Sequence, residues 1–337
     1  RDVLGSRGLG DVYKRQHQPE KYQDMIEHVI RKGNTPAGMH LSIMVQEILD
    51  FLQIQPGQTG FDATLGYGGH TKAMLACLEG RGHIYATDVD PEESAKTKKR
   101  LLEQGYGEEI LTIKLQNFCT IDEIAKEAGG FDFVLADLGV SSMQIDNPER
   151  GFSFKVEGPL DLRLNQKEGI SAAERLDTIT KEELAGMLYE NSDEPYSEEL
   201  AKSITDEIRR GNRMDTTKKL RDVIEKTLMF LPEKERKDTV KKTCQRVFQA
   251  LRIDVNNEFE VLYEFMEKLP ECIKPGGRAA ILTFHSGEDR LVKKALKSGY
   301  KAGLYSDYAK DVIRPSAKEC AQNGRARSTK MRWAIKK

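Results

Sequence analysis

Short apolar runs alternate with amphipathic stretches through residues 43–136 of the chain. The apolar runs are typical of buried strands and cover Gly60–Ala63, His83–Asp88, Leu111–Leu115 and Phe131–Ala136. The amphipathic stretches predict helices over Ile43–Leu52, Thr71–Leu78, Glu92–Leu102 and Ile121–Glu127. Repeated strand–helix units indicate a parallel sheet with helices on both faces, and ligands of such sheets bind at the carboxyl ends of the strands.

The alternation stops after Asp137. Helical patterns follow at Thr180–Tyr189, Glu198–Arg210 and Thr217–Phe230, without a convincing strand pattern up to residue 243. A helix over Arg246–Leu269 and strands over Arg278–Phe284 and Thr329–Ile335 are predicted next. The sequence therefore predicts an α/β domain of residues 38–143 and 244–337, with an inserted helical domain of residues 144–243.

Residues 1–37 stand apart from this pattern. The first sixteen lack an initiator Met and any coherent periodicity, and Gln18–Arg31 has the pattern of a short helix. We expect residues 1–37 to be a leader that is poorly ordered or partly an artefact, and we exclude it from the fold.

The segment Phe61–His70, FDATLGYGGH, is a strand that breaks into a glycine-rich turn and opens a helix. Such a turn presents backbone N–H groups to a nucleotide-like cofactor. The dinucleotide fingerprint requires a third glycine where Thr71 stands, which favours a methyltransferase-type loop over a nicotinamide or flavin site. Asp88 and Asp90 end the next strand, where a carboxylate can accept the ribose hydroxyls, although either could instead cap the helix that begins at Pro91.

Composition narrows the class of protein. The chain has 337 residues, 38% of them hydrophobic, and a net charge of −1, so no global field attracts a polyanion. Lysines and arginines outnumber acids by fourteen to three between Arg290 and Lys337, as in a solvated tail or a surface that contacts phosphates. The five cysteines form no CxxC pair, and no apolar run is long enough to span a membrane. We expect reduced cysteines, no metal, no membrane and a cytoplasmic location.

Eight blocks together resemble a known family. They are DATLGYGGH, ATDVDP, DLGVSSMQID, RGFSF, GPLDLR, FQALRIDVN, PGGRAAILTFHS and RARSTKMR. In this order and spacing they resemble the bacterial 16S ribosomal RNA cytosine methyltransferases called RsmH or MraW, from about His40 to Ala334. The resemblance implies a Rossmann-like class I methyltransferase that transfers a methyl group from S-adenosylmethionine to the exocyclic amine, N4, of a cytosine in the decoding region. The implied partner is small-subunit ribosomal RNA or the 30S subunit, and a homodimer remains open.

The resemblance also implies a set of cofactor contacts. Backbone amides and an imidazole would lie near the methionine carboxylate, a carboxylate at the ribose and an aromatic face at the adenine. For Phe118 packing in the core is an equal alternative, and for His70 a role at the helix start is another. The residues implied are Gly68, Gly69, His70, Asp88, Phe118, Asp137 and Gln144.

A second set of residues would serve the substrate. The loop of Arg150–Phe154 and Gly158–Arg163 combines aromatic rings, arginines and a carboxylate, which suits capture of a flipped cytosine. Phe152 and Phe154 would hold the base or, alternatively, anchor the loop in a core. The predicted catalytic residues are Asp137, which could instead cap the next turn, Asp161 and Arg163. His285 would border the pocket or belong to a network that orients Arg163 or the loop. The predicted RNA phosphate contacts are Arg325, Arg327, Lys330 and Arg332, of which some will point away because a strand presents only one face.

Some positions depart from the family pattern, mostly on the predicted substrate side. They include Asn165, Asp193, Gln245, Gly287 and Gly324. A paralogue with another RNA target, or a relative without activity, is therefore an alternative. A non-catalytic RNA-binding protein would have lost the cofactor residues, which this chain keeps, and Thr71 opposes a dehydrogenase.

Overall fold

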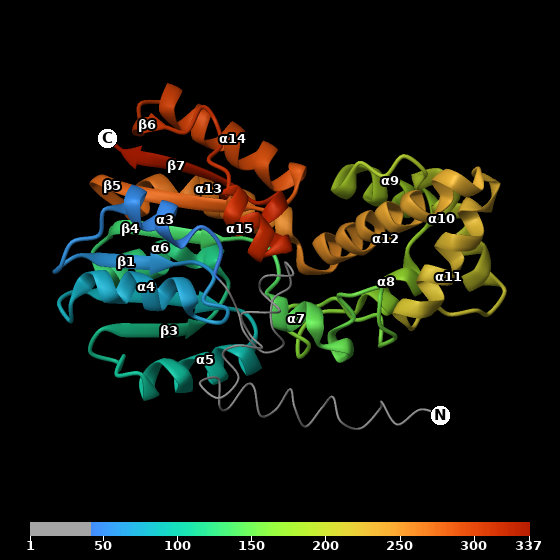
Figure 1. The fold of residues 1–337 in the computed structure, drawn as a ribbon, viewed down its shortest axis with the longest axis horizontal. Helices are drawn as coiled ribbons and strands as arrows, with labels where there is room; N and C mark the ends of the chain where they lie inside the picture. The colour runs from blue at the N-terminus through green and yellow to red at the C-terminus, as the bar shows by residue number, and fades with distance from the viewer. Residues whose placement is uncertain (1–41) are drawn as a thin grey trace. The chain divides into compact units, whose positions relative to one another are not determined.

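The computed structural model describes residues 42–337, which fold into two compact units (Figure 1). The first unit comprises residues 42–88, 92–139 and 264–337, and the second comprises residues 89–91 and 140–263. The expected leader of residues 1–37 and its short helix lie outside the described residues. Among the described residues, no helix is both long and apolar enough to cross a bilayer.

The first unit is built on a seven-stranded sheet in the order β3-β2-β1-β4-β5-β7-β6. Strands β1 to β5 are parallel, and β7 inserts antiparallel between β5 and β6. This topology confirms the predicted Rossmann-like α/β class. The strands are β1 (Thr59–Asp62), β2 (His83–Asp88), β3 (Leu111–Leu115), β4 (Phe131–Asp137), β5 (Ile273–Thr283), β6 (Tyr305–Tyr308) and β7 (Lys330–Lys336).

Helices cover this sheet because each one has an apolar stripe that must be buried. Leu52 of α3, Leu78 of α4 and Leu101 of α5 join one continuous core with the side chains of the central strands. The helix α5 begins at Pro91, as predicted from its fixed φ. The helices are α3 (Val45–Leu52), α4 (Gly69–Leu78), α5 (Pro91–Glu103), α6 (Ile121–Ala128), α13 (Glu258–Cys272), α14 (Ser286–Lys301) and α15 (Ala317–Gln322), with short 3₁₀ turns η2 (Phe118–Thr120) and η5 (Gly324–Ser328).

The second unit is helical and has a core of its own. Its only pairing outside named strands among the described residues is an isolated bridge between Pro159 and Thr216. The helix α9 follows the predicted pattern and begins with a capping box of Thr180 and Glu183. The elements are α7 (Ser142–Asp146), η3 (Pro148–Arg150), α8 (Ala172–Thr178), α9 (Lys181–Ser192), α10 (Ser197–Arg209), α11 (Thr217–Thr227), η4 (Leu228–Phe230) and α12 (Glu233–Asn256).

The prediction of one helix over Arg246–Leu269 was wrong. Asn257 adopts a left-handed conformation with φ of 49°, which ends α12 and lets α13 start at Glu258. The boundary drawn at residue 243 falls inside α12, and the compact unit continues to Tyr263. The sequence reading also passed over β6, a four-residue strand with exposed polar side chains that depends on pairing with β7.

Gly60 tests how tightly the sheet is packed. A Cβ on Gly60 would overlap the ring of Phe133 on the neighbouring strand β4, and Phe133 is fully buried. Gly60→Ala is expected to lower the free energy of unfolding by about 1–3 kcal/mol, because the core cannot accept the methyl group without moving. Urea denaturation measures the change. Gly186→Ala is the matched control, since Gly186 lies in a helix with open space around its Cα and alanine there should be neutral or stabilising.

Candidate functional site

Three carboxylates mark the carboxyl ends of adjacent strands in the first unit. Asp62 ends β1, Asp88 ends β2 and Asp137 ends β4. The register places Asp62 opposite Ala86 of β2 and opposite Leu135 of β4, so β1 lies between the other two strands. The carboxylates therefore gather at one edge of the sheet, where parallel α/β proteins bind ligands.

The glycine loop between β1 and α4 is fixed from two directions. The N–H of Gly66 donates to Oδ2 of Asp88 at 3.0 Å, which ties the loop to β2. The hydroxyl of Thr97 on α5 donates to the carbonyl of Gly66 at 2.6 Å. Arg100 donates to the carbonyl of Tyr67 at 2.8 Å, and its guanidinium lies 3.7 Å from the centroid of the Tyr67 ring. Sequence reasoning missed Thr97 and Arg100, because nothing in a helix pattern distinguishes the face that touches a loop.

Gly68 and Gly69 form the start of α4 because no other residue fits there. Gly68 has φ of 82°, and a Cβ on it would lie 2.8 Å from Cγ2 of Thr97. A Cβ on Gly69 would overlap the side chain of Ser42. No side chain caps α4, so its first N–H groups and the positive end of the helix dipole are available to an anion.

His70 is buried in the first turn of α4, where both of its ring nitrogens meet groups of the chain. Nε2 lies 2.8 Å from the carbonyl of Ile43, which can only accept, so Nε2 carries a proton. Nδ1 lies 3.3 Å from Oδ2 of Asp137. Burial would lower the pKa of His70, but the hydrogen bond and charge of Asp137 outweigh it and raise the pKa to about 9. The imidazole is therefore a cation at neutral pH and holds the Asp137 carboxylate in place.

Asp137 and Asp62 have different environments despite their proximity in the sheet. Asp62 is 1% exposed and accepts hydrogen bonds from the hydroxyl of Thr71 at 2.6 Å and the N–H of Thr64 at 3.0 Å. Burial is the main cause that raises the pKa of Asp62. Oδ1 of Asp137 is buried and has no hydrogen-bond partner among the described residues. An orphaned carboxylate oxygen costs free energy unless a ligand supplies a donor. Sequence reasoning missed Asp62, although its place at the end of a buried strand was a signal.

Phe118 lies in the 3₁₀ turn η2 after β3. Its ring makes an edge-to-face contact with Phe265 of α13, with centroids 5.2 Å apart and planes at 88°. The side chain is half-buried. Packing against Phe265 orients the ring, which agrees with the alternative that Phe118 packs in the core. Part of the ring remains accessible.

Gln144 and Asp90 belong to one buried network in the second unit. The side chain of Gln144 completes a capping box with Ser141 and donates to Oδ2 of Asp90 at 3.2 Å. Arg150 forms an ion pair with the same oxygen at 2.6 Å, and Asp90 and Arg150 are both buried. Arg150 also donates to the carbonyls of residues 163 and 164. Asp90 therefore pairs with an arginine and supports the loop, which neither the ribose interpretation nor the capping interpretation anticipated.

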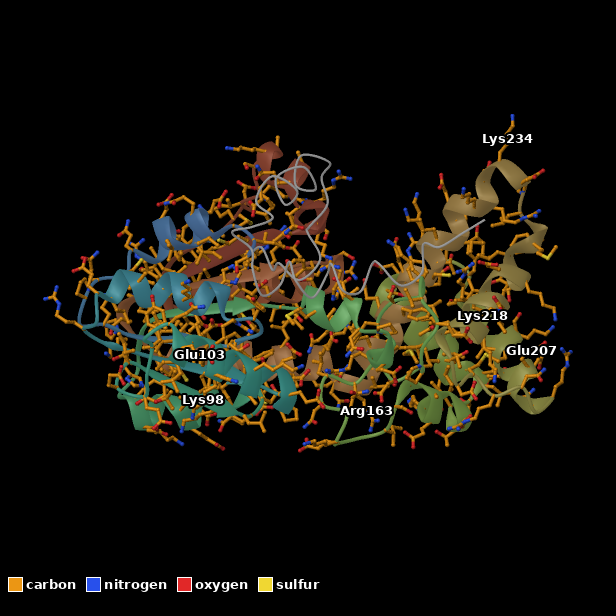
Figure 2. The ribbon with its side chains drawn as sticks, turned by 60° about the horizontal axis from the view of Figure 1, so that its bottom comes forward. Lys98, Glu103, Arg163, Glu207, Lys218 and Lys234 are labelled. Carbon is orange, nitrogen blue, oxygen red and sulfur yellow. The ribbon has the colours of Figure 1, made fainter. Side chains whose placement is uncertain are left out.

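Asp161 and Arg163 form a two-pronged ion pair on that loop. Nε and Nη2 of Arg163 each donate to a carboxylate oxygen of Asp161 at 2.8 Å (Figure 2 labels Arg163). Burial would raise the pKa of Asp161, but the hydrogen bonds from Arg163 and Gln166 prevail and lower it. Both oxygens are committed, so Asp161 is a poor proton acceptor and a good anchor for Arg163.

The two phenylalanines of the loop lie against the helical core of the second unit. Phe152 and Phe154 are half-buried and pack on its apolar side chains. Phe154 meets Phe248 of α12 edge-on at 5.8 Å, and the guanidinium of Arg150 lies 5.7 Å from the Phe152 ring. One side of each ring therefore anchors the loop in the core, as the alternative interpretation of these residues predicted.

The remaining predicted residues lie in the C-terminal part of the first unit. His285 precedes α14, and its Nε2 lies 3.2 Å from Oε1 of Glu288. Arg325 and Arg327 lie in η5, just before the last strand. Arg332 is one of the basic residues that point away, because its guanidinium is buried and pairs with Asp289 at 2.7 Å. Lys330 contacts the same carboxylate at 3.1 Å.

Comparisons with known proteins agree with the resemblance of the sequence blocks. A model of the MraW methylase family matches residues 37–337. The chain is 82% identical to ribosomal RNA small subunit methyltransferase H 1 of Agathobacter rectalis, over 94% of this chain and 91% of that protein. It is 70% identical to the protein of the same name from Lachnoclostridium phytofermentans, over 97% and 89%. It is 62% identical to methyltransferase H 2 of Alkaliphilus metalliredigens, over 95% and 91%.

The pair of His70 and Asp137 gives a pH-dependent contribution to stability. The pKa of His70 is raised from 6.5 to about 9 in the folded protein, so the stabilisation is complete below pH 6.5 and is lost as the pH rises through 9. The free energy of unfolding of the native protein should exceed that of His70→Gln most at the acid end of this window. Denaturant titrations across the window measure the difference, with His83→Gln as the baseline for losing one histidine. A difference that stays constant with pH would show that Asp137 does not hold the imidazolium.

Proposed function

The chain belongs to the MraW methylase family, and on that basis we propose that it methylates N4 of a cytosine in the decoding region of 16S ribosomal RNA. Its cofactor is S-adenosylmethionine, which supplies a methyl group activated by a positively charged sulfur. Its relatives are named as methyltransferases of small-subunit ribosomal RNA, which supports the RNA substrate. The choice of cytosine N4 follows from the resemblance of the sequence blocks.

The observation that carries the proposal is the Asp137 carboxylate at the end of β4. One of its oxygens faces the His70 imidazolium, and the other is buried without a partner among the described residues. The glycine turn lies at the same sheet edge and leaves the N-terminus of α4 without a cap. The uncapped amides at the start of α4 fit the carboxylate of a cofactor, and the unsatisfied carboxylate oxygen fits the N–H donor of a substrate amine.

We assign the cofactor contacts on this arrangement. The amides of Gly69 and His70 would hold the methionine carboxylate, since a helix N-terminus favours an anion. The amide of Gly68 donates to the carbonyl of Leu65 at 2.8 Å, so Gly68 would contact the cofactor through its Cα, where it lacks a side chain. Asp88 would accept the ribose hydroxyls, and Phe118 would lie on the adenine. The side chain of Gln144 is held by Ser141 and Asp90, so we assign it a role in shaping the site through the loop.

Proton removal is the part of the reaction that the protein must supply. The lone pair of a cytosine amine is delocalised into the ring, so positive charge develops on nitrogen only as the methyl group transfers. We assign the proton acceptor to Asp137 because Oδ1 is uncommitted, and not to Asp161, whose oxygens both bind Arg163. Asp161 then positions Arg163, and this pair would hold the base together with Phe152.

The contacts to the rest of the RNA are assigned by charge. Arg327 is exposed on η5, and Arg325 is half-buried beside it. These two would contact phosphates near His285 in the C-terminal part of the first unit, whereas Arg332 and Lys330 serve the ion pair with Asp289. The helical insertion would contribute to recognition of the 30S subunit.

Asp88 tests the cofactor assignment. Asp88→Ala removes both the proposed ribose acceptor and the hydrogen bond to Gly66 that holds the loop. It should weaken the binding of S-adenosylmethionine by about 1–3 kcal/mol, the cost of leaving donors unsatisfied. Isothermal titration calorimetry measures the affinity. Asp132→Ala, which removes a carboxylate at the opposite end of β4, is the control and should leave the affinity unchanged.

The reaction itself is tested on 30S subunits from a strain that lacks its own cytosine N4 methyltransferase. Mass spectrometry of nucleosides should find methyl groups on the cytosine amine after incubation with the protein and cofactor. Asp137→Asn should slow turnover about 10²-fold or more, as expected for loss of a general base, with a smaller effect on cofactor affinity. Asp238→Asn on the exposed face of α12 is the control for losing one carboxylate.

If the protein binds the cofactor but does not methylate the cytosine amine, the proposed reaction is wrong. The substrate-side departures from the family pattern, among them Asn165, Gln245 and Gly287, would then account for the difference. The chain would then be a paralogue with another RNA target or an RNA-binding relative without activity.

A further inference from the structure

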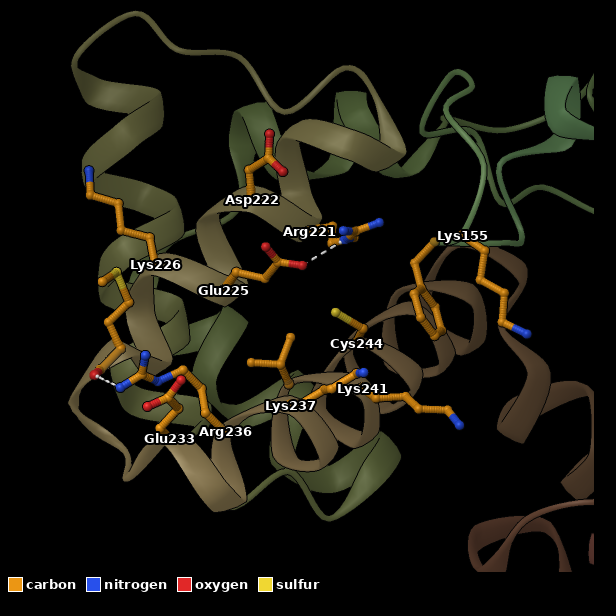
Figure 3. A pocket seen from close by; sticks show the side chains of 13 residues that line it. Lys155, Arg221, Asp222, Glu225, Lys226, Glu233, Arg236, Lys237, Lys241 and Cys244 are labelled. Atoms are coloured by element: carbon orange, nitrogen blue, oxygen red, sulfur yellow. Dashed lines mark hydrogen bonds and ion pairs between the residues drawn. The ribbon is translucent and has the colours of Figure 1, made fainter. Parts of the chain in front are cut away.

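The second unit contains an open pocket between α11 and α12 that no part of the proposed reaction uses. Figure 3 shows it with the side chains that surround it. The volume is about 920 Å³, within the range of about 300–1,000 Å³ of ligand sites. The lining residues are Phe154, Lys155, Arg221, Asp222, Glu225, Lys226, Met229, Glu233, Arg236, Lys237, Val240, Lys241 and Cys244.

The charges of the pocket are uneven once their partners are considered. Six cations and three acids line it. On the α11 side, Glu225 pairs with Arg221 at 2.7 Å and Asp222 pairs with Lys218 at 2.6 Å, so both acids are neutralised locally. The guanidinium of Arg236 donates only to backbone carbonyls and keeps its charge.

Three lysines on the other side have no ion pair among the described residues. Lys237 and Lys241 are exposed and four residues apart on α12, so they share one face of the helix. Like charges at this spacing destabilise a helix slightly, whereas α11 uses the same spacing for opposite charges. Lys155 adds a third exposed ammonium from the loop. Glu233 lies four residues before Lys237 on α12 and offsets part of this charge, which leaves two exposed ammonium groups for an external anion.

The floor of the pocket is apolar. Phe154, Val240 and Cys244 belong to or pack on the core of the second unit, and Met229 is 62% exposed at the rim. Burial raises the pKa of the Cys244 thiol to about 12, so the thiol stays neutral. An aromatic ring and a thioether give a surface on which flat, polarisable groups can lie.

We propose that this pocket binds single-stranded RNA, with phosphates on Lys155, Lys237 and Lys241 and a base against Phe154 and Met229. The proposal rests on the proposed function, because that function makes RNA the polyanion the protein meets. A row of cations above an aromatic floor matches the alternation of phosphates and bases in a single strand. An acidic peptide would satisfy the lysines but would leave the aromatic floor without a partner. The pocket would therefore hold RNA outside the nucleotide that reacts.

The test removes the three lysines together. Binding of an oligocytidylate is measured by fluorescence anisotropy at several salt concentrations for the native protein and for the triple variant Lys155→Ala, Lys237→Ala, Lys241→Ala. The slope of log K against log salt should become shallower by about two, since each phosphate contact to a single strand contributes about 0.7. The triple change to arginine should restore the slope, because arginine keeps the charge.

A matched control removes the same charge elsewhere in the same unit. Lys202, Lys234 and Lys242 are exposed, lie on α10 and α12, and do not line the pocket. Their triple alanine variant should leave the slope close to that of the native protein. Equal slopes in the pocket and control variants would overturn the proposal. Loss of polyglutamate binding without loss of RNA binding would overturn it too and identify an acidic peptide as the occupant.

Methylation of 30S subunits separates this proposal from the proposed function. If the native protein methylates the subunit while the pocket variant binds and methylates equally well, the pocket proposal fails and the function stands. If the native protein methylates nothing but the salt slope still depends on the three lysines, the RNA site stands and the proposed reaction fails. Affinity for S-adenosylmethionine should be unchanged in the pocket variant, which shows that the first unit remains folded.

Discussion

The structure depends on how the negative charges of three aspartates are compensated at the carboxyl edge of the sheet. Parallel pairing of β1, β2 and β4 brings the ends of three strands together, and each strand ends in an aspartate. Like carboxylates in a poorly solvated place repel each other, so each needs its own compensation. Asp88 receives the amide of Gly66, Asp62 receives the hydroxyl of Thr71, and Asp137 receives the imidazolium of His70.

This compensation also decides which groups remain available to chemistry. The oxygens of Asp62 accept hydrogen bonds, and its pKa is raised. Asp62 therefore has a structural role, because its bond from Thr71 holds the start of α4 in place. His70 is committed on both sides, so it acts on a ligand only through Asp137 and through its own backbone amide. Of the three aspartates at this edge, Asp137 is the one with a buried oxygen that has no hydrogen-bond partner among the described residues. The proposed division between structural and catalytic carboxylates follows from these contacts.

In the second unit, two arginines are likewise neutralised by neighbouring carboxylates. Arg150 is neutralised by Asp90, and Arg163 by Asp161, so these cations organise the loop of residues 140–165 more than they attract an anion. The exposed lysines along α12 have no such partners among the described residues. The paired arginines hold the loop in place. The unpaired lysines on the surface of α12 leave positive charge that can bind a polyanion.

The sequence determined the local features of this protein. The alternation of apolar runs and helices gave the Rossmann-like sheet, and Gly68 and Gly69 marked the turn because only glycine fits those positions. The place of Asp88 and Asp137 at strand ends followed from the same periodicity. These features depend on residues close together in the chain, which a linear pattern records.

Only the tertiary structure decided which groups pair. The partners of Asp137, Asp90 and Arg332 come from segments 43 to 67 residues away, and no periodicity encodes such a contact. The break at Asn257 and the strand β6 likewise depend on packing and on pairing with a distant strand. A candidate site can therefore be located from strand ends and glycines, but the availability of each side chain depends on long-range contacts that form only when the chain is folded.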